Sequence, residues 1–184
     1  TDGFFFFFNY LLGDILNHMK HDVFMQKALN EAQQSLDQKL LPVGAVLVID
    51  NEVVAKAHKD ETTSYHLDHA ETLLVREYFK GKKVYRGDID ITLYTTLEPC
   101  MMCLGVILHL PINRLVYAAK DPYGGGCCIM DHRENLPIRH QNNIEIIGGI
   151  CEDEAKEQLR EFLKITEQSF YKDTENPLVH YILN

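Results

Sequence analysis

The stretch TTLEPCMMC, residues 95–103, places two cysteines three positions apart just after a proline. On local spacing alone, Cys100 and Cys103 fit a disulfide, a redox pair, half of a structural zinc site or part of a catalytic site. Proline is well tolerated at the first position of a helix, so Pro99 predicts a helix whose first turn carries both thiols. Cysteines at i and i+3 point the same way, and the helix dipole favours their thiolate forms. This pair can bind a soft divalent ion but fills only two coordination positions.

A second short motif, His69-Ala70-Glu71, begins another predicted helix. A structural zinc ion normally has four protein ligands, and the sequence holds no second C-x-x-C pair. His69 can serve as the third ligand, and one nitrogen, two thiolates and an open position form a catalytic zinc arrangement. Glu71 would then take a proton from zinc-bound water and deliver it to a substrate. An H-x-E motif followed by P-C-x-x-C is the signature of zinc-dependent hydrolytic deaminases.

Hydrophobic patterning along the rest of the sequence predicts alternating helices and strands. The expected helices cover residues 20–38, 69–81, 99–110 and 151–172, and the expected strands cover 41–50, 52–58, 89–97, 113–119 and 142–149. In the first helix Asp22 is a candidate cap, and the apolar positions at helical spacing are Val23, Phe24, Ala28, Ala32 and Leu36. Asp50-Asn51 is expected to form the tight turn of a hairpin. This order predicts an α/β fold, a three-layer α/β/α sandwich around a mixed sheet.

Length and charge limit the classes of protein. The chain has 184 residues, a formal net charge of -9 and a pI near 5.4. This acidic balance counts against a protein that holds nucleic acid by bulk neutralisation of phosphates. We expect a single domain over residues 19–184. Residues 1–18 are interpreted as an N-terminal extension, a tag or an artefact, whose apolar run is too short to span a membrane.

The cysteine content indicates the redox environment. Five cysteines are an odd number, and no secretory signal precedes them. This pattern predicts reduced thiols in a cytoplasmic protein rather than a disulfide framework. We expect Cys127, Cys128 and Cys151 to be reduced structural thiols.

Together these motifs resemble the cytidine deaminase-like superfamily of zinc deaminases. The segments PVGAVLV, HAE, LYTTLEPCMMCLGVI, RLVYAAKDP and IEIIGG are similar to bacterial tRNA adenosine deaminases and to the neighbouring guanine and cytosine deaminases. The similarity runs from about residue 19 to residue 171. By motif position it implies that His69, Cys100 and Cys103 bind zinc and that Glu71 is the catalytic proton shuttle. It also implies a homodimer and a five-stranded mixed sheet, with the two motif helices side by side beneath the site.

The same resemblance suggests which residues contact the substrate. The candidates are Pro42, Val43, Gly44, His58, Ala70, Glu98 and Asp121. In relatives an asparagine lies eleven positions before the zinc histidine, and His58 takes that position here. Asp121 matches a position near the substrate in tRNA-acting members, and the alternative is that it starts a turn. His66 could approach the metal or lie in a solvated loop. The tail lacks the basic helix of tRNA-acting members, so we expect it to fold over the pocket or pack across a dimer.

The sequence therefore predicts a zinc-dependent hydrolytic deaminase of a nucleobase or nucleoside. Zinc-bound hydroxide would replace an amino group by an oxo group and release ammonia, with Glu71 as the proton shuttle. One alternative is a tRNA adenosine-to-inosine deaminase, in which the same chemistry acts on a flipped wobble base. The acidic charge disfavours tRNA as a partner. A second alternative is an inactive partner subunit that keeps zinc for structural purposes.

Overall fold

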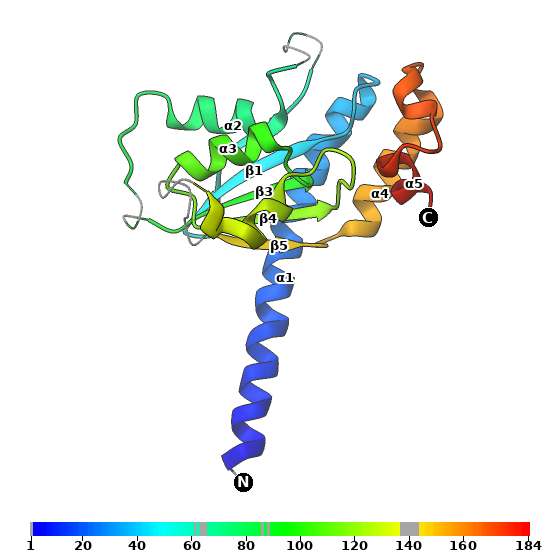
Figure 1. The fold of residues 1–184 in the computed structure, drawn as a ribbon. Helices are drawn as coiled ribbons and strands as arrows, with labels where there is room; N and C mark the ends of the chain where they lie inside the picture. Colours follow the sequence, from blue (N-terminus) through cyan, green and yellow to red (C-terminus); the bar gives the residue numbers. More distant parts are fainter. Residues whose placement is uncertain (1, 61, 63–65, 86, 88, 137–143) are drawn as a thin grey trace.

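A five-stranded mixed sheet lies at the centre of the computed structural model, which describes residues 2–60, 62, 66–85, 87, 89–136 and 144–184, with side chains from Met19 onward (Figure 1). The strands are β1 (Gly44–Ile49), β2 (Glu52–His58), β3 (Ile91–Leu97), β4 (Arg114–Ala119) and β5 (Glu145–Gly148). Their order is β2-β1-β3-β4-β5. β1 is antiparallel to both of its neighbours, whereas the β3–β4 and β4–β5 pairs are parallel. The predicted mixed sheet is confirmed, and each strand lies within its predicted range.

The hairpin between β1 and β2 turns at Asp50 and Asn51, as the sequence predicts. Their φ angles are 50° and 65°. Positive φ at both central residues is the geometry of a type I′ turn, whose twist matches that of the flanking strands. Aspartate and asparagine tolerate this conformation better than most residues. The turn fixes the register that pairs Ile49 with Glu52.

Helices cover both faces of the sheet and complete the predicted three-layer α/β/α sandwich (Figure 1). One face is covered by α2 (Ala70–Phe79) and α3 (Met101–His109), which share one apolar core with the sheet. The other face is covered by α1 (Asp2–Asp37), α4 (Glu152–Ile165) and α5 (Pro177–Leu183), which share a second core. The 3₁₀ segments η1 (Cys127–Asn135) and η3 (Ser169–Lys172) lie in the connections. No helix in the described part of the chain has both the length and the apolarity needed to cross a membrane.

The first helix is longer than the sequence predicts. α1 continues without a break from Asp2 to Asp37, so Asp22 lies inside the helix, and the prediction that it caps the start is wrong. No proline interrupts this stretch, so nothing in the backbone forces a helix to begin near residue 20. Figure 1 shows the amino-terminal half of α1 extending away from the sheet. Within the packed half, the predicted apolar positions are buried except Val23, which is 57% exposed.

The carboxyl-terminal segment is divided differently from the prediction. α4 ends at Ile165 rather than near residue 172, and η3 and α5 follow it. α5 has a clear start signal in the sequence: the Asn176 side chain accepts a hydrogen bond from the Leu178 amide at 2.9 Å, and Pro177 occupies the first helical position. The tail is therefore a folded part of the sandwich and not an extension of α4.

The direction of the strands decides where the functional groups lie. Because β1 is antiparallel to both β2 and β3, these two strands run the same way, and β4 and β5 run parallel to β3. The carboxyl ends of four strands and the start of β1 therefore lie at one edge of the sheet. α2 follows β2 and α3 follows β3, so both helices begin at this edge. Open α/β sheets bind their ligands beyond the carboxyl ends of the strands.

β1 begins against α1 at a point that has room only for glycine. A Cβ atom on Gly44 would meet backbone atoms of Ala28, Glu31 and Ala32 in α1. The Gly44 amide donates a hydrogen bond to Thr96 Oγ1 at 3.1 Å, which joins β1 to β3 at the same point. The close contact of α1 with the sheet thus depends on the missing side chain at this position.

We predict that Gly44→Ala lowers the free energy of unfolding of the zinc-loaded protein by about 1–3 kcal/mol, because the added methyl group forces α1 and β1 apart. Urea denaturation followed by circular dichroism measures this change. Gly105→Ala is the matched control, since a Cβ there meets no described atom within 4 Å. Alanine inside a helix should stabilise that variant by up to about 1 kcal/mol. A Gly44→Ala protein as stable as the wild type would contradict the tight packing.

Candidate active site

Three atoms that could bind a metal ion, called the metal-binding group below, come together from the two helix starts at this edge of the sheet. His69 Nδ1 lies 3.6 Å from Cys100 Sγ and 3.4 Å from Cys103 Sγ, and the two sulfur atoms are 3.7 Å apart. A tetrahedral zinc ion with ordinary bond lengths would hold its ligands about 3.6 Å apart from nitrogen to sulfur and about 3.8 Å apart from sulfur to sulfur. The spacing and the donor set therefore fit zinc. Within the described residues this group could supply three ligands, which leaves a fourth position for water or substrate.

Local structure holds these three residues in place. His69 directly precedes α2, and its amide donates a hydrogen bond to Thr72 Oγ1 at 3.0 Å, an interaction typical of helix N-termini. Cys100 directly precedes α3, which begins at Met101, two residues after the predicted start. Cys103 lies in the first turn of α3, so the spacing of three residues puts both thiols on one side of that turn.

The two cysteines differ in their affinity for a proton. The pKa of Cys100 is lowered to about 4, chiefly because its sulfur shares a hydrogen bond with Cys103 and also because His69 interacts with it. The pKa of Cys103 is raised. The largest cause is the same hydrogen bond with Cys100, and the next largest is burial. One thiolate is thus already favoured without a metal, and the second thiol needs a cation to release its proton. A divalent ion bound between them would supply that charge.

Glu71 lies in the first turn of α2, beside the metal-binding group. Its side chain is buried, with only 3% of the residue exposed, and it interacts with the Cys103 thiol. Burial raises the pKa of Glu71 to about 7. A carboxyl group with a pKa near neutrality can both accept and donate a proton at working pH, as a general acid–base catalyst must.

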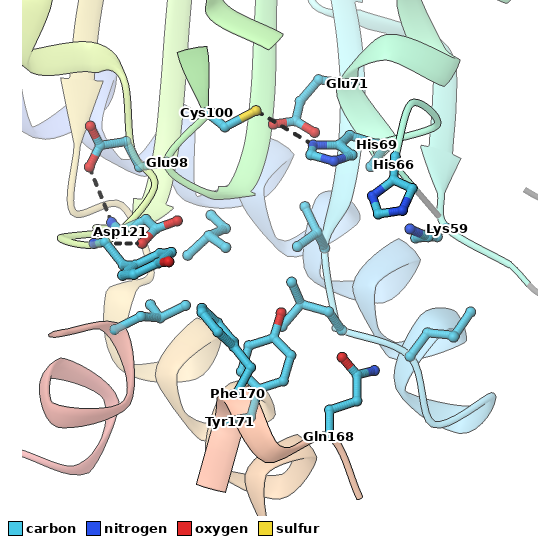
Figure 2. Close-up of a pocket in the computed structure, with 17 residues that line it drawn as sticks. Lys59, His66, His69, Glu71, Glu98, Cys100, Asp121, Gln168, Phe170 and Tyr171 are labelled. Atoms are coloured by element: carbon cyan, nitrogen blue, oxygen red, sulfur yellow. Dashed lines mark hydrogen bonds between the residues drawn. The ribbon is translucent and has the colours of Figure 1, made fainter. Parts of the chain in front are cut away.

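A pocket of about 310 Å³ opens in front of Glu71 and the metal-binding group (Figure 2). Its apolar and aromatic lining consists of Leu40, Leu41, Val43, Leu97, Ala70, Tyr123, Phe170, Tyr171 and Leu178. Its polar lining consists of Lys59, His66, His69, Glu71, Glu98, Cys100, Asp121 and Gln168. Figure 2 shows Phe170 and Tyr171 across the pocket from His69 and Cys100. The volume is at the lower end of the range for ligand pockets and suits one nucleoside-sized group.

The predicted substrate contacts are divided by the structure into two groups. Val43, Ala70, Glu98 and Asp121 line the pocket. Pro42, Gly44 and His58 are outside the lining that the described residues form. Gly44 packs on α1.

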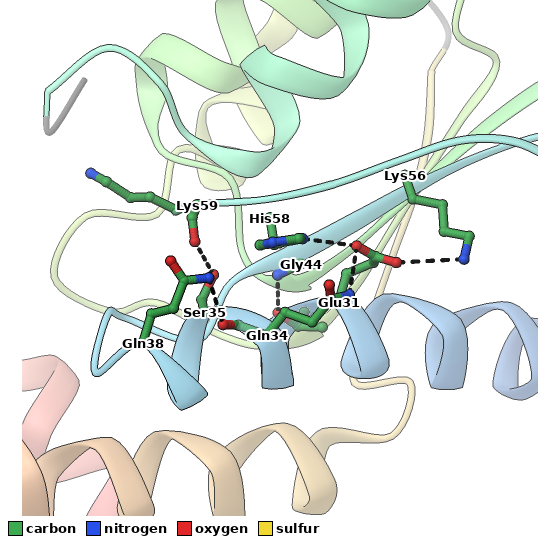
Figure 3. A network of polar contacts seen from close by, with 9 residues as sticks. Glu31, Gln34, Ser35, Gln38, Gly44, Lys56, His58 and Lys59 are labelled. Atoms are coloured by element: carbon green, nitrogen blue, oxygen red, sulfur yellow. Dashed lines mark hydrogen bonds and ion pairs between the residues drawn. The ribbon is translucent and has the colours of Figure 1, made fainter. Parts of the chain in front are cut away.

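His58 makes its contact on the opposite side of the strand from the pocket. Its Nδ1 lies 2.9 Å from Glu31 Oε2 on α1, and Glu31 also pairs with Lys56 at 3.5 Å (Figure 3). The residue that lines the pocket at the end of β2 is the next one, Lys59. His58 therefore lies outside this lining, because side chains at adjacent positions of an extended chain point to opposite sides, and its contact with a substrate stays a prediction.

Glu98 and Asp121 line the pocket, and their carboxylates also organise its wall. Glu98 is buried and accepts hydrogen bonds from the amides of Asp121 at 3.1 Å and Cys127 at 3.0 Å. Asp121 accepts from the amides of Tyr123 at 3.0 Å and Gly124 at 2.9 Å, which is the turn-forming alternative expected from the sequence. Both residues therefore hold the glycine-rich loop after β4 against the pocket.

Sequence reasoning missed most of the wall opposite the metal-binding group. Gln168, Phe170, Tyr171 and Leu178 come from the tail, which folds over the pocket as one of its two expected arrangements. His66 lines the pocket from the exposed side. The aromatic residues of the tail carry no motif, so only their tertiary position shows a contact with the pocket.

The fold and the site define a zinc-dependent deaminase, an enzyme that removes an amino group by hydrolysis. The chain belongs to the family described as the cytidine and deoxycytidylate deaminase zinc-binding region, which matches residues 18–119. This confirms the class of enzyme and the zinc cofactor predicted from the sequence.

Two curated relatives show which members of the family the chain resembles. The tRNA-specific adenosine deaminase of Bacillus subtilis (strain 168) is 34% identical over 145 residues, which cover 78% of this chain and 88% of that protein. The tRNA-specific adenosine deaminase of Agrobacterium fabrum is 34% identical over 145 residues, which cover 77% of this chain and 92% of that protein.

Solved structures of deaminases also resemble this chain. One comes from a study of A-to-I editing by tRNA:A34 deaminases at the wobble position of transfer RNA. It has a TM-score of 0.63 and 34% identity, covering 74% of this chain and 98% of that chain. A diaminohydroxyphosphoribosylaminopyrimidine deaminase/reductase from Thermotoga maritima has a TM-score of 0.63 and 28% identity, covering 80% of this chain and 41% of that chain. The predicted family and fold are both confirmed.

We predict that the purified protein binds about one zinc ion per chain and that Cys100→Ala loses it, because two remaining ligands hold the ion too weakly. Metal analysis after dialysis measures the zinc content. Cys128→Ala is the control, since Cys128 is an exposed cysteine outside the metal-binding group. Full zinc occupancy in Cys100→Ala would refute the assignment of this ligand.

Proposed function

We propose that this deaminase converts adenosine to inosine at the wobble position of tRNA, with His69, Cys100 and Cys103 holding the zinc ion and Glu71 moving the proton. The observation that carries the proposal is the 34% identity to the Bacillus subtilis tRNA-specific adenosine deaminase across 88% of that protein. The proposal reverses the order of the two substrates expected from the sequence, where a small base or nucleoside came first.

Hydrolytic deamination exchanges the amino group of adenine for the oxygen of water and releases ammonia. When bound, zinc supplies the activated water that this exchange needs at neutral pH. Glu71 lines the pocket beside the metal-binding group. Its carboxyl group would deliver one proton to the ring nitrogen N1 and another to the departing amine. The buried position of Glu71 keeps bulk water from competing for these protons.

The aromatic wall of the pocket fits a base that has left its stack. Tyr123 and Phe170 have ring centroids 4.9 Å apart, and Phe170 and Tyr171 have centroids 4.8 Å apart. Enzymes that act on a base within a nucleic acid hold the extruded base between aromatic or apolar side chains. The pocket volume of about 310 Å³ is of the size that one such nucleoside needs.

A small-molecule nucleoside is the second candidate substrate. The observations in its favour are the net charge of -9 and the tail residues that cover part of the pocket. An RNA strand must reach past Gln168 and Phe170 to place a base in the pocket, whereas a free nucleoside needs less room. The two candidates share the same chemistry and differ only in what is attached to the ribose.

Glu71→Gln should retain about one zinc per chain and lose ammonia release by about 100-fold or more, since the amide cannot transfer protons. Zinc content and ammonia release measured on the same preparation test both parts. Glu77→Gln on the same helix is the control, because Glu77 is exposed and should leave the rate unchanged. Undiminished turnover in Glu71→Gln would remove the proton-transfer role.

An anticodon stem-loop with adenosine at position 34 should release ammonia at a higher kcat/KM than free adenosine, because the flanking nucleotides add binding contacts. Binding of the stem-loop should weaken as salt rises, since phosphate contacts release counterions. The same stem-loop with guanosine at position 34 serves as the control for base identity. Faster deamination of free adenosine, with no salt-dependent binding of the stem-loop, would favour the small-molecule substrate.

A further inference from the structure

Lys59 brings a positive charge into the pocket close to the metal-binding group. It directly follows β2, and adjacent side chains at a strand end point to opposite faces. His58 contacts Glu31 on α1, whereas the Lys59 side chain lines the pocket (Figures 2 and 3). The Ser35 hydroxyl donates a hydrogen bond to the Lys59 carbonyl at 2.6 Å. α1 therefore fixes the backbone from which the ammonium group extends.

The charges around Lys59 limit what its ammonium group can bind. The Lys59 charge acts on His69, which places it within electrostatic reach of the metal-binding group. It also interacts with Asp68, whose carboxylate accepts a hydrogen bond from Arg76 Nη1 at 2.7 Å. Asp68 is thus shared between two cations. A half-buried ammonium group in such a position favours a further anionic or hydrogen-bond-accepting group from a ligand.

Two acidic residues of the lining, Glu98 and Asp121, have their hydrogen-bond partners elsewhere in the pocket wall. Glu98 and Asp121 accept hydrogen bonds from backbone amides on the β4 side of the pocket. Figure 2 shows Lys59 and His66 on the side of the pocket away from Glu98 and Asp121. His66 can donate a hydrogen bond from its imidazole ring. The pocket therefore has one wall that carries hydrogen-bond donors for an anion.

Phosphate is the anionic group that a substrate of this enzyme can bring. Adenine and ribose are uncharged at neutral pH, whereas a nucleotide carries at least one negative charge on its phosphate. An ammonium group binds phosphate oxygens through charge-assisted hydrogen bonds.

We propose that Lys59, together with His66, forms an anion subsite that binds a phosphate group of the nucleotide whose base is deaminated. The inference rests on the proposed function, because it needs a nucleotide-derived substrate, and it specifies that this substrate is phosphorylated. The phosphate can come from a mononucleotide or from the backbone of an RNA strand, and both sources present the same chemistry to Lys59.

The test compares Lys59→Met with the wild type, both loaded with zinc, on adenosine, adenosine 5′-monophosphate and the adenosine-34 stem-loop. Ammonia release gives kcat/KM for each substrate. The subsite predicts a loss of about tenfold or more on a phosphorylated substrate and no loss on adenosine, because methionine keeps the length of the side chain without its charge. Lys59→Arg should recover most of the loss. Lys56→Met is the control, since Lys56 is an exposed lysine on β2, three residues before Lys59.

If kcat/KM falls only for the mononucleotide, the subsite binds the phosphate of a free nucleotide. If kcat/KM falls only for the stem-loop, the subsite binds a phosphate of the RNA backbone. Equal losses on adenosine and on both phosphorylated substrates, no loss at all, or loss of zinc from Lys59→Met would overturn the subsite. Calorimetric binding of inorganic phosphate is measured on the same proteins and needs no turnover. Phosphate should bind the wild type more tightly than Lys59→Met, and equal binding would overturn the subsite. An enzyme that deaminates no adenosine substrate but binds phosphate through Lys59 would refute the proposed function alone.

Discussion

β1 runs antiparallel to both β2 and β3, and this reversal gives β2, β3, β4 and β5 a common direction. Four carboxyl strand ends then share one edge of the sheet, and the helices that follow β2 and β3 must begin there. The positive ends of these two helix dipoles lie next to the thiols and the imidazole, where they favour thiolates. The chemistry of the site is thus a consequence of strand direction. Had β2 run the other way, His69 and Cys100 would lie at opposite edges.

The loop after β4 connects the side of the pocket that carries the metal-binding group with the side that the tail residues form. Glu98, at the end of β3, accepts hydrogen bonds from the amides of Asp121 and Cys127 in this loop. The Lys120 amide donates to Tyr181 Oη at 3.1 Å, which links the start of the same loop to α5. A buried carboxylate with two amide partners is costly to disturb, because loss of either partner leaves a polar group without compensation. One short segment therefore connects α5 to Glu98, two residues before Cys100.

The chemistry of the site could be predicted from the sequence because its parts are local. His69, Glu71, Cys100 and Cys103 all lie at helix starts, so their directions follow from helical spacing once the helices are placed. Lys59 could not be found in this way. A count of residues back from His69 assumes a fixed loop length, whereas the residue that faces the pocket is set by the pleat of β2 and its register with β1. The tail residues depend on packing between segments far apart in the sequence, which no local pattern encodes.

The acidic composition of this chain conflicts with tRNA binding only if that binding depends on the net charge of the whole protein surface. The net charge of -9 opposes long-range attraction of a polynucleotide. A charge inside a pocket works differently, because it acts over a short distance in an environment less screened than the surface. One ammonium group at Lys59 can therefore favour a phosphate without a basic surface around it. Recognition of this kind places the selectivity in the fit of one nucleotide, which is consistent with both the acidic composition and the small aromatic pocket.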